Sequence, residues 1–216
     1  MKYSMYLLLL GFCFAGCCND KTNPEQTSTE METKTERSAE FKSINAREIP
    51  GNVIEMIADQ WALFTAGDEK SYNTMTIAWG GIGNVWGKPA TTCYIHPDRY
   101  TFEFIEKGSY YTLCFFDAEY REALLFCGSK SGRDYTDKNK AVEAGLTPAY
   151  TENGSVYFKE AYLVLECKKL YSDQFKADCF ATKIETENSA GEKSIYNDRD
   201  TYHKFYIGEI VNCLMR

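Results

Sequence analysis

Arg99, Tyr100 and Thr101 are the residues whose types and spacing most directly suggest chemistry. They follow His96-Pro97, which ends an apolar run, and they precede the helix-like stretch FEFIEK. The guanidinium of Arg99 is a planar fork of donors that suits a phosphate group. Thr101 adds a hydroxyl, and the amides of a helix start carry partial positive charge. The pattern favours an anion site; the alternative is an ordinary helix start in which Arg99 pairs with Glu103.

A strand-like stretch, NTMTIAWGG, places small hydroxyl residues between apolar ones. Amides and hydroxyls along such a strand can bond the polar edge of a flat heterocycle, while apolar side chains cover its face. An ordinary strand with one hydrated face is the alternative. The candidate contacts are Asn73, Thr74, Met75, Thr76 and Trp79.

The glycine- and serine-rich stretch CGSKSGRD could form a loop that cups an anion through Ser129, Lys130, Ser131 and Arg133. A solvated loop is the alternative. A nucleophilic role for Cys127 is disfavoured, because the same sulfur can close the apolar face of a helix.

His203 enters the last strand-like run, YHKFYIGEI, where it could sit above a ligand or serve the structure alone. It is one of two histidines in the chain, so a multi-histidine metal site is disfavoured. No CxxC pair occurs, and no Ser-His-Asp pattern is specific enough to propose. We therefore expect neither a metal site nor a catalytic side chain.

The elements that must position these residues follow from the hydrophobic pattern. We expect at least six strands joined by short helices, which favours a mainly β fold, an antiparallel barrel with helical decorations. Neither GxGxxG nor GxxxxGK[ST] is present. Expected strands cover 44–50, 61–68, two in 73–95 joined by a glycine-rich connection, 110–116, a hairpin-like pair in 155–172, and 202–216. Expected helices cover 51–60, 99–107, 117–129 and a piece ending at Gly145, and 181–201 is a polar insertion.

The net charge limits the class of partner, and the N-terminal residues predict where the domain is located. The formal charge of −7 and the lack of a basic stripe exclude a nucleic-acid partner. Residues 1–17 contain Lys2, a short apolar core and Phe-Ala-Gly-Cys, which predict a bacterial lipoprotein signal with lipid on Cys17. Residues 18–43 are rich in Thr, Glu, Lys and Ser and predict a flexible tether. The folded domain is expected at 44–216, attached to a membrane by lipid.

Six cysteines fall in the expected domain. Cys93, Cys114, Cys167 and Cys213 each lie in an apolar strand-like run, where cysteine behaves as a small buried hydrophobe. We expect mostly free thiols, although export also permits disulfides.

The order of these stretches resembles the flavin reductase-like, FMN-binding split-barrel family, and within it the flavoredoxin-like branch. The stretches that carry the resemblance are NTMTIAWGG, KPATTCYIHPDRYTFEFIEK, CGSKSGRD, AGLTP, YFKEAYLVLECKKLY and YHKFYIGEIV. The resemblance extends from about Ile44 to the C-terminus. It implies a six-stranded antiparallel split barrel that forms a homodimer with FMN at the subunit interface.

The resemblance also implies roles for the candidate residues. Asn73 to Thr76 and Trp79 would lie along the flavin ring, and Arg99, Tyr100 and Thr101 would hold the FMN phosphate. Ser129, Lys130, Ser131 and Arg133 match a loop near the flavin. His203 matches the histidine of a Gly-Asp-His motif that serves nicotinamide binding, but Thr201 and Tyr202 replace its first two residues.

Three functions are compatible with these features. The first is a flavin reductase that uses NADH or NADPH. The second is a membrane-tethered FMN electron carrier that exchanges electrons with a redox partner protein. The third is a non-redox module that binds flavin. The altered motif before His203 and the predicted export count against efficient use of NAD(P)H.

Overall fold

The computed structural model describes residues 40–135, 139–187 and 191–216, within the compact unit Ala39–Arg216. The predicted signal peptide 1–17, with Cys17, and the tether up to residue 39 lie outside the described residues. Among the residues described, no helix combines the length and apolar character needed to cross a bilayer.

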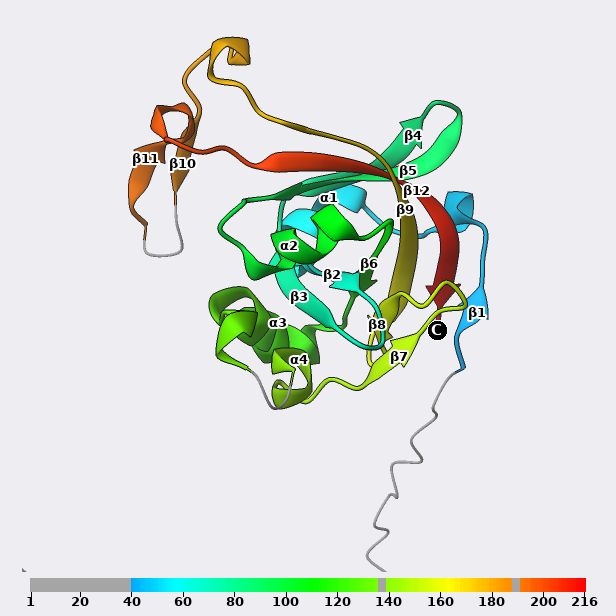
Figure 1. Cartoon of the computed structure of the whole chain (residues 1–216). Coiled ribbons are helices and arrows are strands. Elements are labelled where there is room, and N and C mark those ends of the chain that lie inside the picture. The colour runs from blue at the N-terminus through cyan, green and yellow to red at the C-terminus, as the bar shows by residue number, and fades with distance from the viewer. Residues whose placement is uncertain (1–39, 136–138, 188–190) are drawn as a thin grey trace, which may run out of the picture. The chain divides into compact units, whose positions relative to one another are not determined.

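One antiparallel sheet forms the body of this unit (Figure 1). Its order is β3-β2-β6-β9-β12-β5-β4, and β1 pairs with β12 at the C-terminal end of that strand. The mainly β, antiparallel prediction is confirmed, but the eight strands of this sheet exceed the six that the family resemblance implies. The strands are β1 (Lys42–Ser43), β2 (Ala62–Gly67), β3 (Tyr72–Ile77), β4 (Gly80–Val85), β5 (Lys88–Ile95), β6 (Tyr110–Phe115), β9 (Leu163–Gln174) and β12 (Lys204–Met215).

The two edge strands of this order, β3 and β4, are consecutive in the chain. Only Ala78 and Trp79 separate the end of β3 from the start of β4. The sheet must therefore curl until its edges approach, yet no ladder joins β3 to β4 among the described residues. We call this opening the split.

Burial on both faces of the sheet defines the core. Leu63 and Phe64 are neighbours on β2 and both are buried, but they belong to different apolar clusters because successive strand residues point to opposite faces. The cluster of Phe64 contains Tyr111 and Leu165. The cluster of Leu63 contains Leu124 of α3 (Arg121–Ser129) and therefore binds that helix to the sheet.

The helix α2 (Tyr100–Lys107) is fixed at both ends. Lys169 of β9 donates to the carbonyl of Ile105 at 2.6 Å, which places a cation at the negative end of the helix. At the other end, Asn73 of β3 donates to the Thr101 hydroxyl at 2.7 Å. The first turn of α2 is thereby held beside β3.

Several predicted elements differ from those observed. Residues 44–50 do not form a strand, because Asn45 and Glu48 form a capping box around the 3₁₀ turn Ala46–Glu48. The glycine-rich connection is itself β4, in a hairpin that turns at Trp86-Gly87. The folded unit also begins before Ile44, since β1 pairs with β12.

The remaining elements are short. The predicted hairpin in 155–172 is wrong, because β8 (Val156–Phe158) pairs with β7 (Pro148–Tyr150) and not with β9. The polar insertion contains the pair β10 (Glu185–Glu187) and β11 (Lys193–Ile195), which stands off the main sheet (Figure 1). The other helical segments are α1 (Val53–Glu55) continued by the π-helical turn Met56–Gln60, α4 (Lys140–Glu143), and 3₁₀ turns at Ala118–Tyr120, Gly132–Asp134, Ala177–Cys179 and Tyr196–Asp198.

The cysteines of the domain carry free thiols. Cys93, Cys114, Cys127, Cys167 and Cys213 are buried, whereas Cys179 is exposed. Burial raises the pKa of Cys127 to about 11, although the nearby Lys140 acts in the opposite direction. A thiol of that pKa stays protonated at neutral pH, which agrees with the packing role expected for this cysteine.

Candidate functional site

Two adjacent cavities lie beside β3 and the start of α2, and the first of them also contacts the loop after α3. The first, which we call the anion cavity, has a volume of about 110 Å³. The predicted residues in its lining are Asn73, Met75, Arg99, Tyr100, Thr101, Ser129, Lys130 and Ser131. The structure thus brings together three stretches that are far apart in the sequence.

Arg99 occupies the N-cap position of α2, with an extended backbone. Its side chain is exposed and has no hydrogen bond or ion pair with any described residue. The expected alternative, pairing with Glu103, does not occur in the structure. Arg99 therefore borders the anion cavity as a cation with no counter-ion in the described part of the chain.

Arg133, not Arg99, pairs with Glu103. Its Nη2 lies 2.5 Å from Oε1 of Glu103, and its Nη1 donates to the Asp98 carbonyl at 3.3 Å. Its guanidinium also lies over the Tyr100 ring, 4.8 Å from the centroid. These contacts engage the side chain outside the anion cavity, and Arg133 lines neither this cavity nor the adjacent one, so a ligand contact from Arg133 stays a prediction.

Thr101 and Asn73 form the buried wall of the anion cavity. Thr101 is fully buried and Asn73 is 2% exposed. Because Asn73 donates to the Thr101 hydroxyl oxygen, the hydroxyl proton is free to reach an acceptor in the cavity. Gly132 packs so closely on Asn73 that a Cβ there would overlap the amide, which makes glycine necessary at this point of the loop.

Lys140 is a lining residue that the sequence did not reveal. It is 3% exposed, and its Nζ donates to the carbonyls of Cys127 at 2.6 Å and Lys130 at 2.7 Å. An ammonium has three N–H donors, so one remains for a ligand. Burial lowers the pKa of Lys140 to about 8, and the positive charge of Arg99 acts in the same direction.

The second cavity, which we call the aromatic cavity, has a volume of about 190 Å³ and lies at the split. Met75 and Arg99 line both cavities, so the two form one continuous candidate site. Trp79, in the two-residue link between β3 and β4, is 46% exposed. The lining of the aromatic cavity also includes Thr76, Ala78, Tyr94, His96 and His203.

The two threonines of β3 differ from expectation. Thr74 is fully buried and lines neither cavity: its hydroxyl accepts from the Thr65 hydroxyl at 2.9 Å and donates to the Phe64 carbonyl at 3.2 Å. The predicted contact from Thr74 is therefore not supported. Thr76 lines the aromatic cavity, but its hydroxyl donates to the Leu124 carbonyl.

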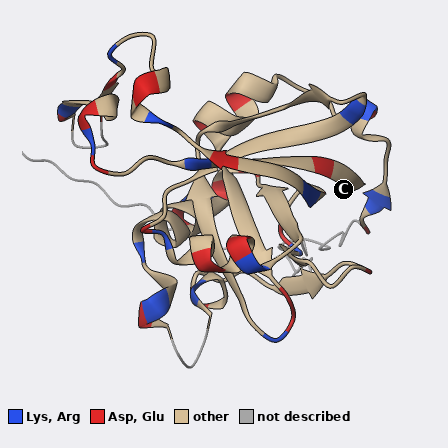
Figure 2. Ribbon diagram, turned by 45° about the horizontal axis from the view of Figure 1, so that its top comes forward, with Lys and Arg blue, Asp and Glu red and all other residues tan. Residues whose placement is uncertain are grey.

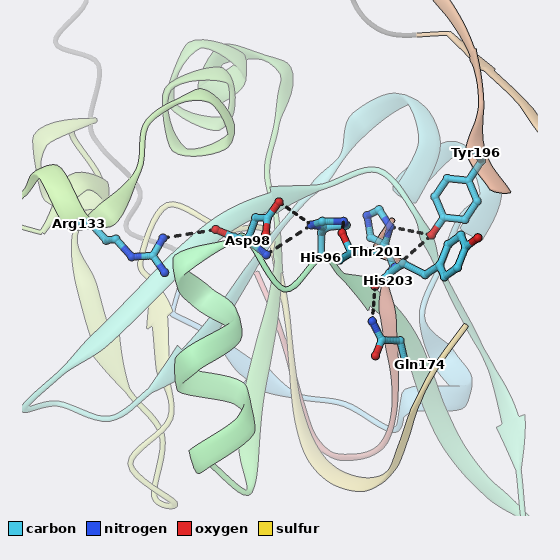
Figure 3. A network of polar contacts seen from close by, with 8 residues as sticks. His96, Asp98, Arg133, Gln174, Tyr196, Thr201 and His203 are labelled. Carbon is cyan, nitrogen blue, oxygen red and sulfur yellow. Dashed lines mark hydrogen bonds and ion pairs between the residues drawn. The ribbon is translucent and has the colours of Figure 1, made fainter. Parts of the chain in front are cut away.

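His203 and His96 stand at the edge of the aromatic cavity, with ring centroids 5.0 Å apart (Figure 3). His96 Nε2 lies 3.1 Å from the Thr201 hydroxyl, and His203 Nδ1 lies 2.8 Å from the Tyr196 hydroxyl. Trp79 is 5.0 Å from the His203 ring. Burial lowers the pKa of His203 to about 4, and His96 acts in the same direction, so His203 is neutral at neutral pH.

A larger cavity, about 580 Å³, lies toward the C-terminal end of α2. Its charged lining residues are Asp68, Lys70, Glu103 and Lys107, so both signs are mixed and no single ligand charge is favoured. The anion cavity differs, because its lining contains three basic residues, Arg99, Lys130 and Lys140, and a single acidic one, Asp98. Elsewhere acidic and basic residues are interspersed along the described chain (Figure 2). No group of three metal-ligating side chains occurs within the described ranges.

Comparisons with known structures place this geometry in a fold family. The chain is similar to a flavoredoxin from Methanosarcina acetivorans, with 20% identity, a TM-score of 0.54 and coverage of 73% of this chain and 68% of that one. A flavoredoxin of Desulfovibrio vulgaris (Miyazaki F) gives 21% identity, a TM-score of 0.53 and coverages of 81% and 76%. An FMN-binding domain of a flavin reductase-like enzyme from Shewanella baltica gives 15% identity, a TM-score of 0.55 and coverage of 82% of this chain and 77% of that one.

The sequence itself supports the same conclusion. No curated protein matches it. A family model, described as the flavin reductase like domain, matches residues 55–216 and so covers β2 to β12 and every residue of both cavities. The chain therefore belongs to the flavin reductase-like domain family.

Proposed function

We propose that the chain binds FMN across the split, with its phosphate in the anion cavity and its ring system in the aromatic cavity. The observation that carries this proposal is the continuity of the two cavities through Met75 and Arg99. One cavity offers unpaired cationic and hydroxyl donors, and the other is bordered by aromatic and apolar side chains. FMN likewise has an anionic phosphate at one end, which would match the first cavity, and a flat ring system at the other, which would match the second.

The donor set of the anion cavity fits a phosphate. Arg99 supplies a guanidinium fork, Lys140 one remaining N–H, and Thr101 a hydroxyl proton. At the start of α2 the Phe102 amide donates to the Arg99 carbonyl, whereas the amides of Tyr100 and Thr101 have no acceptor within the helix and add positive potential. Ser129 and Ser131 are exposed on the opposite rim, where they can reach the same anion.

Bound FMN would supply two-electron chemistry, with NADH or NADPH as the proposed electron donor. The residues of the chain would contribute binding, orientation and exclusion of water, and none is proposed as a general acid or base. Trp79 and Met75 would cover the ring, and Arg99 would hold the phosphate end. His203 would face the donor.

We further propose that two copies of the chain form a homodimer with the site at their interface. The exposure of Trp79 and of Trp86, which is 64% exposed at the tip of the β4–β5 hairpin, supports this proposal. Large exposed aromatic side chains are typical of protein interfaces. Sedimentation of the purified chain at several concentrations tests it.

A second candidate is a membrane-tethered FMN electron carrier. The insertion before β12 packs Tyr196 against His203, on the side where a nicotinamide would approach. In this version lipid on Cys17 would hold the protein at a membrane, and the donor would be a redox partner protein. Incorporation of labelled palmitate into the wild-type chain but not into Cys17→Ser tests the anchor.

One experiment separates these functions. The purified chain is mixed with FMN, desalted, and its visible spectrum is followed during addition of NADH or NADPH. Steady oxidation of the nucleotide supports the reductase. A tightly retained yellow colour without nucleotide oxidation supports the carrier. A colourless protein after desalting, with no quenching of FMN fluorescence, contradicts flavin binding.

A further inference from the structure

The polar insertion between β9 and β12 contains a buried tyrosine. Tyr196 is 5% exposed although its neighbours Glu192, Asp198 and Arg199 are exposed. Rings surround it: Phe180 and Tyr202 lie 5.9 Å from its centroid and Trp79 lies 6.0 Å away. The insertion therefore folds a small aromatic cluster onto the edge of the aromatic cavity.

The hydroxyl of Tyr196 makes two contacts with the same residue. The backbone N–H of His203 donates to Oη at 3.1 Å, and Oη lies 2.8 Å from Nδ1 of the His203 ring (Figure 3). The carbonyl of His203 also accepts from the Phe175 amide at 3.1 Å. Backbone and ring of His203 are thus both fixed, by Tyr196 of the insertion and by Phe175, the residue that follows β9.

These contacts determine which ring nitrogen carries the proton. The backbone N–H can only donate, so it uses one lone pair of Oη. The phenol proton then has Nδ1 as its acceptor among the described contacts of this hydroxyl, because no other contact is present. With Nδ1 accepting, the proton of a neutral imidazole must be on Nε2. Burial raises the pKa of Tyr196, which keeps the phenol protonated and able to donate.

We propose that Tyr196 is a positioning residue that holds His203 in its Nε2–H tautomer, so that His203 offers a hydrogen-bond donor to a carbonyl oxygen of the electron donor in the aromatic cavity. The carbonyl role rests on the proposed function, whereas the tautomer does not. His203 could accept a hydrogen bond there if Nδ1 carried the proton. The insertion therefore selects which ligand groups fit.

The surroundings of His203 are compatible with a neutral ring that donates. The charged or titratable groups that act on it are His96, Arg99 and Arg199, together with the phenol of Tyr196. Asp98, the nearest carboxylate in this network, contacts His96 at 3.3 Å. The cationic groups oppose protonation of His203, so the ring stays a single-proton donor across neutral pH.

The test is nitrogen NMR of the full chain labelled with ¹⁵N-histidine. The chain has two histidines, so a His96→Gln variant assigns both rings. We expect wild-type His203 to show a protonated Nε2 and an unprotonated Nδ1. Tyr196→Phe keeps the buried ring but removes the hydroxyl, and we expect averaged tautomers in this variant. Tyr202→Phe is the matched control, because its hydroxyl donates to the Asn197 carbonyl, and should leave the spectrum unchanged.

A protonated Nδ1 in the wild type, or an unchanged pattern in Tyr196→Phe, overturns the proposal. With FMN present, Tyr196→Phe should raise the KM for NADH about two- to tenfold, the loss of one neutral hydrogen bond, and should leave FMN binding unchanged. An unchanged KM overturns the carbonyl role. If the wild type binds FMN but never oxidises NADH, the nicotinamide carbonyl is excluded as the acceptor, while the spectra still decide the tautomer.

Discussion

Replacement of Arg99 by alanine tests the phosphate assignment most directly. The side chain has no intramolecular partner among the described residues, so its removal breaks no contact of the fold. Unfolding free energy should therefore change by less than about 0.5 kcal/mol. A charge-assisted hydrogen bond to an anion contributes about 1.5–3 kcal/mol. Because Arg99 is exposed, water screens it, and we expect the lower value, about tenfold in Kd.

The assay is quenching of flavin fluorescence, with FMN and riboflavin titrated in parallel. Riboflavin lacks the phosphate, so Arg99→Ala should weaken FMN binding and leave riboflavin binding unchanged. Arg133→Ala is the matched control, since that guanidinium is similarly exposed but bound to Glu103, and it should change FMN affinity less than about twofold. Equal losses for both flavins, or no loss for FMN, would refute the reasoning.

Three further predictions follow from the same geometry. Thr101→Val leaves the buried Asn73 amide without its acceptor and should lower unfolding stability by about 1–3 kcal/mol in urea titrations; an unchanged midpoint would contradict the role of this bond. FMN affinity should fall as pH rises through about 8, because Lys140 then loses its proton, and Lys140→Met should weaken binding at pH 7 and abolish this dependence; a pH-dependent Kd that survives in the variant would argue against Lys140. In Gly208→Ala a Cβ would overlap the buried Tyr111 ring, and thermal unfolding should show a loss of about 1–3 kcal/mol, whereas retained stability would mean that β12 can shift.

The part of the site that could be predicted from sequence is local. Arg99 and Thr101 lie within one turn of a helix start, so their proximity follows from backbone geometry alone. The strand at Asn73 and the loop at Ser129 could be assigned to the same cavity only through the family resemblance, because periodicity does not specify which elements meet. The antiparallel β class followed from strand patterning, whereas β4 was expected as a connection, because this glycine-rich strand carries few residues typical of strands.

The differences between the predicted and the observed placement of these residues have physical causes that a linear sequence does not display. Arg133 was assigned to the ligand, but Glu103 on the facing helix is a closer anion. Thr74 was expected to contact the ligand together with Asn73, yet adjacent strand residues point to opposite faces and the Thr74 hydroxyl bonds to Thr65. Lys140 was missed because burial of a lysine depends on carbonyls supplied by Cys127 and Lys130 of another segment. Each outcome is decided by a tertiary neighbour.

The split has a consequence for the local stability of the protein without a bound ligand. Strands β3 and β4 each lack a hydrogen-bonded neighbour on one side within the described sheet, so their amides on that side should exchange with solvent faster than those of β9. A ligand bound between β3 and β4 would connect two strands that no backbone hydrogen bond joins in the described sheet. Occupancy should then raise the melting temperature in proportion to the logarithm of ligand concentration, and protection of β3 and β4 should increase first.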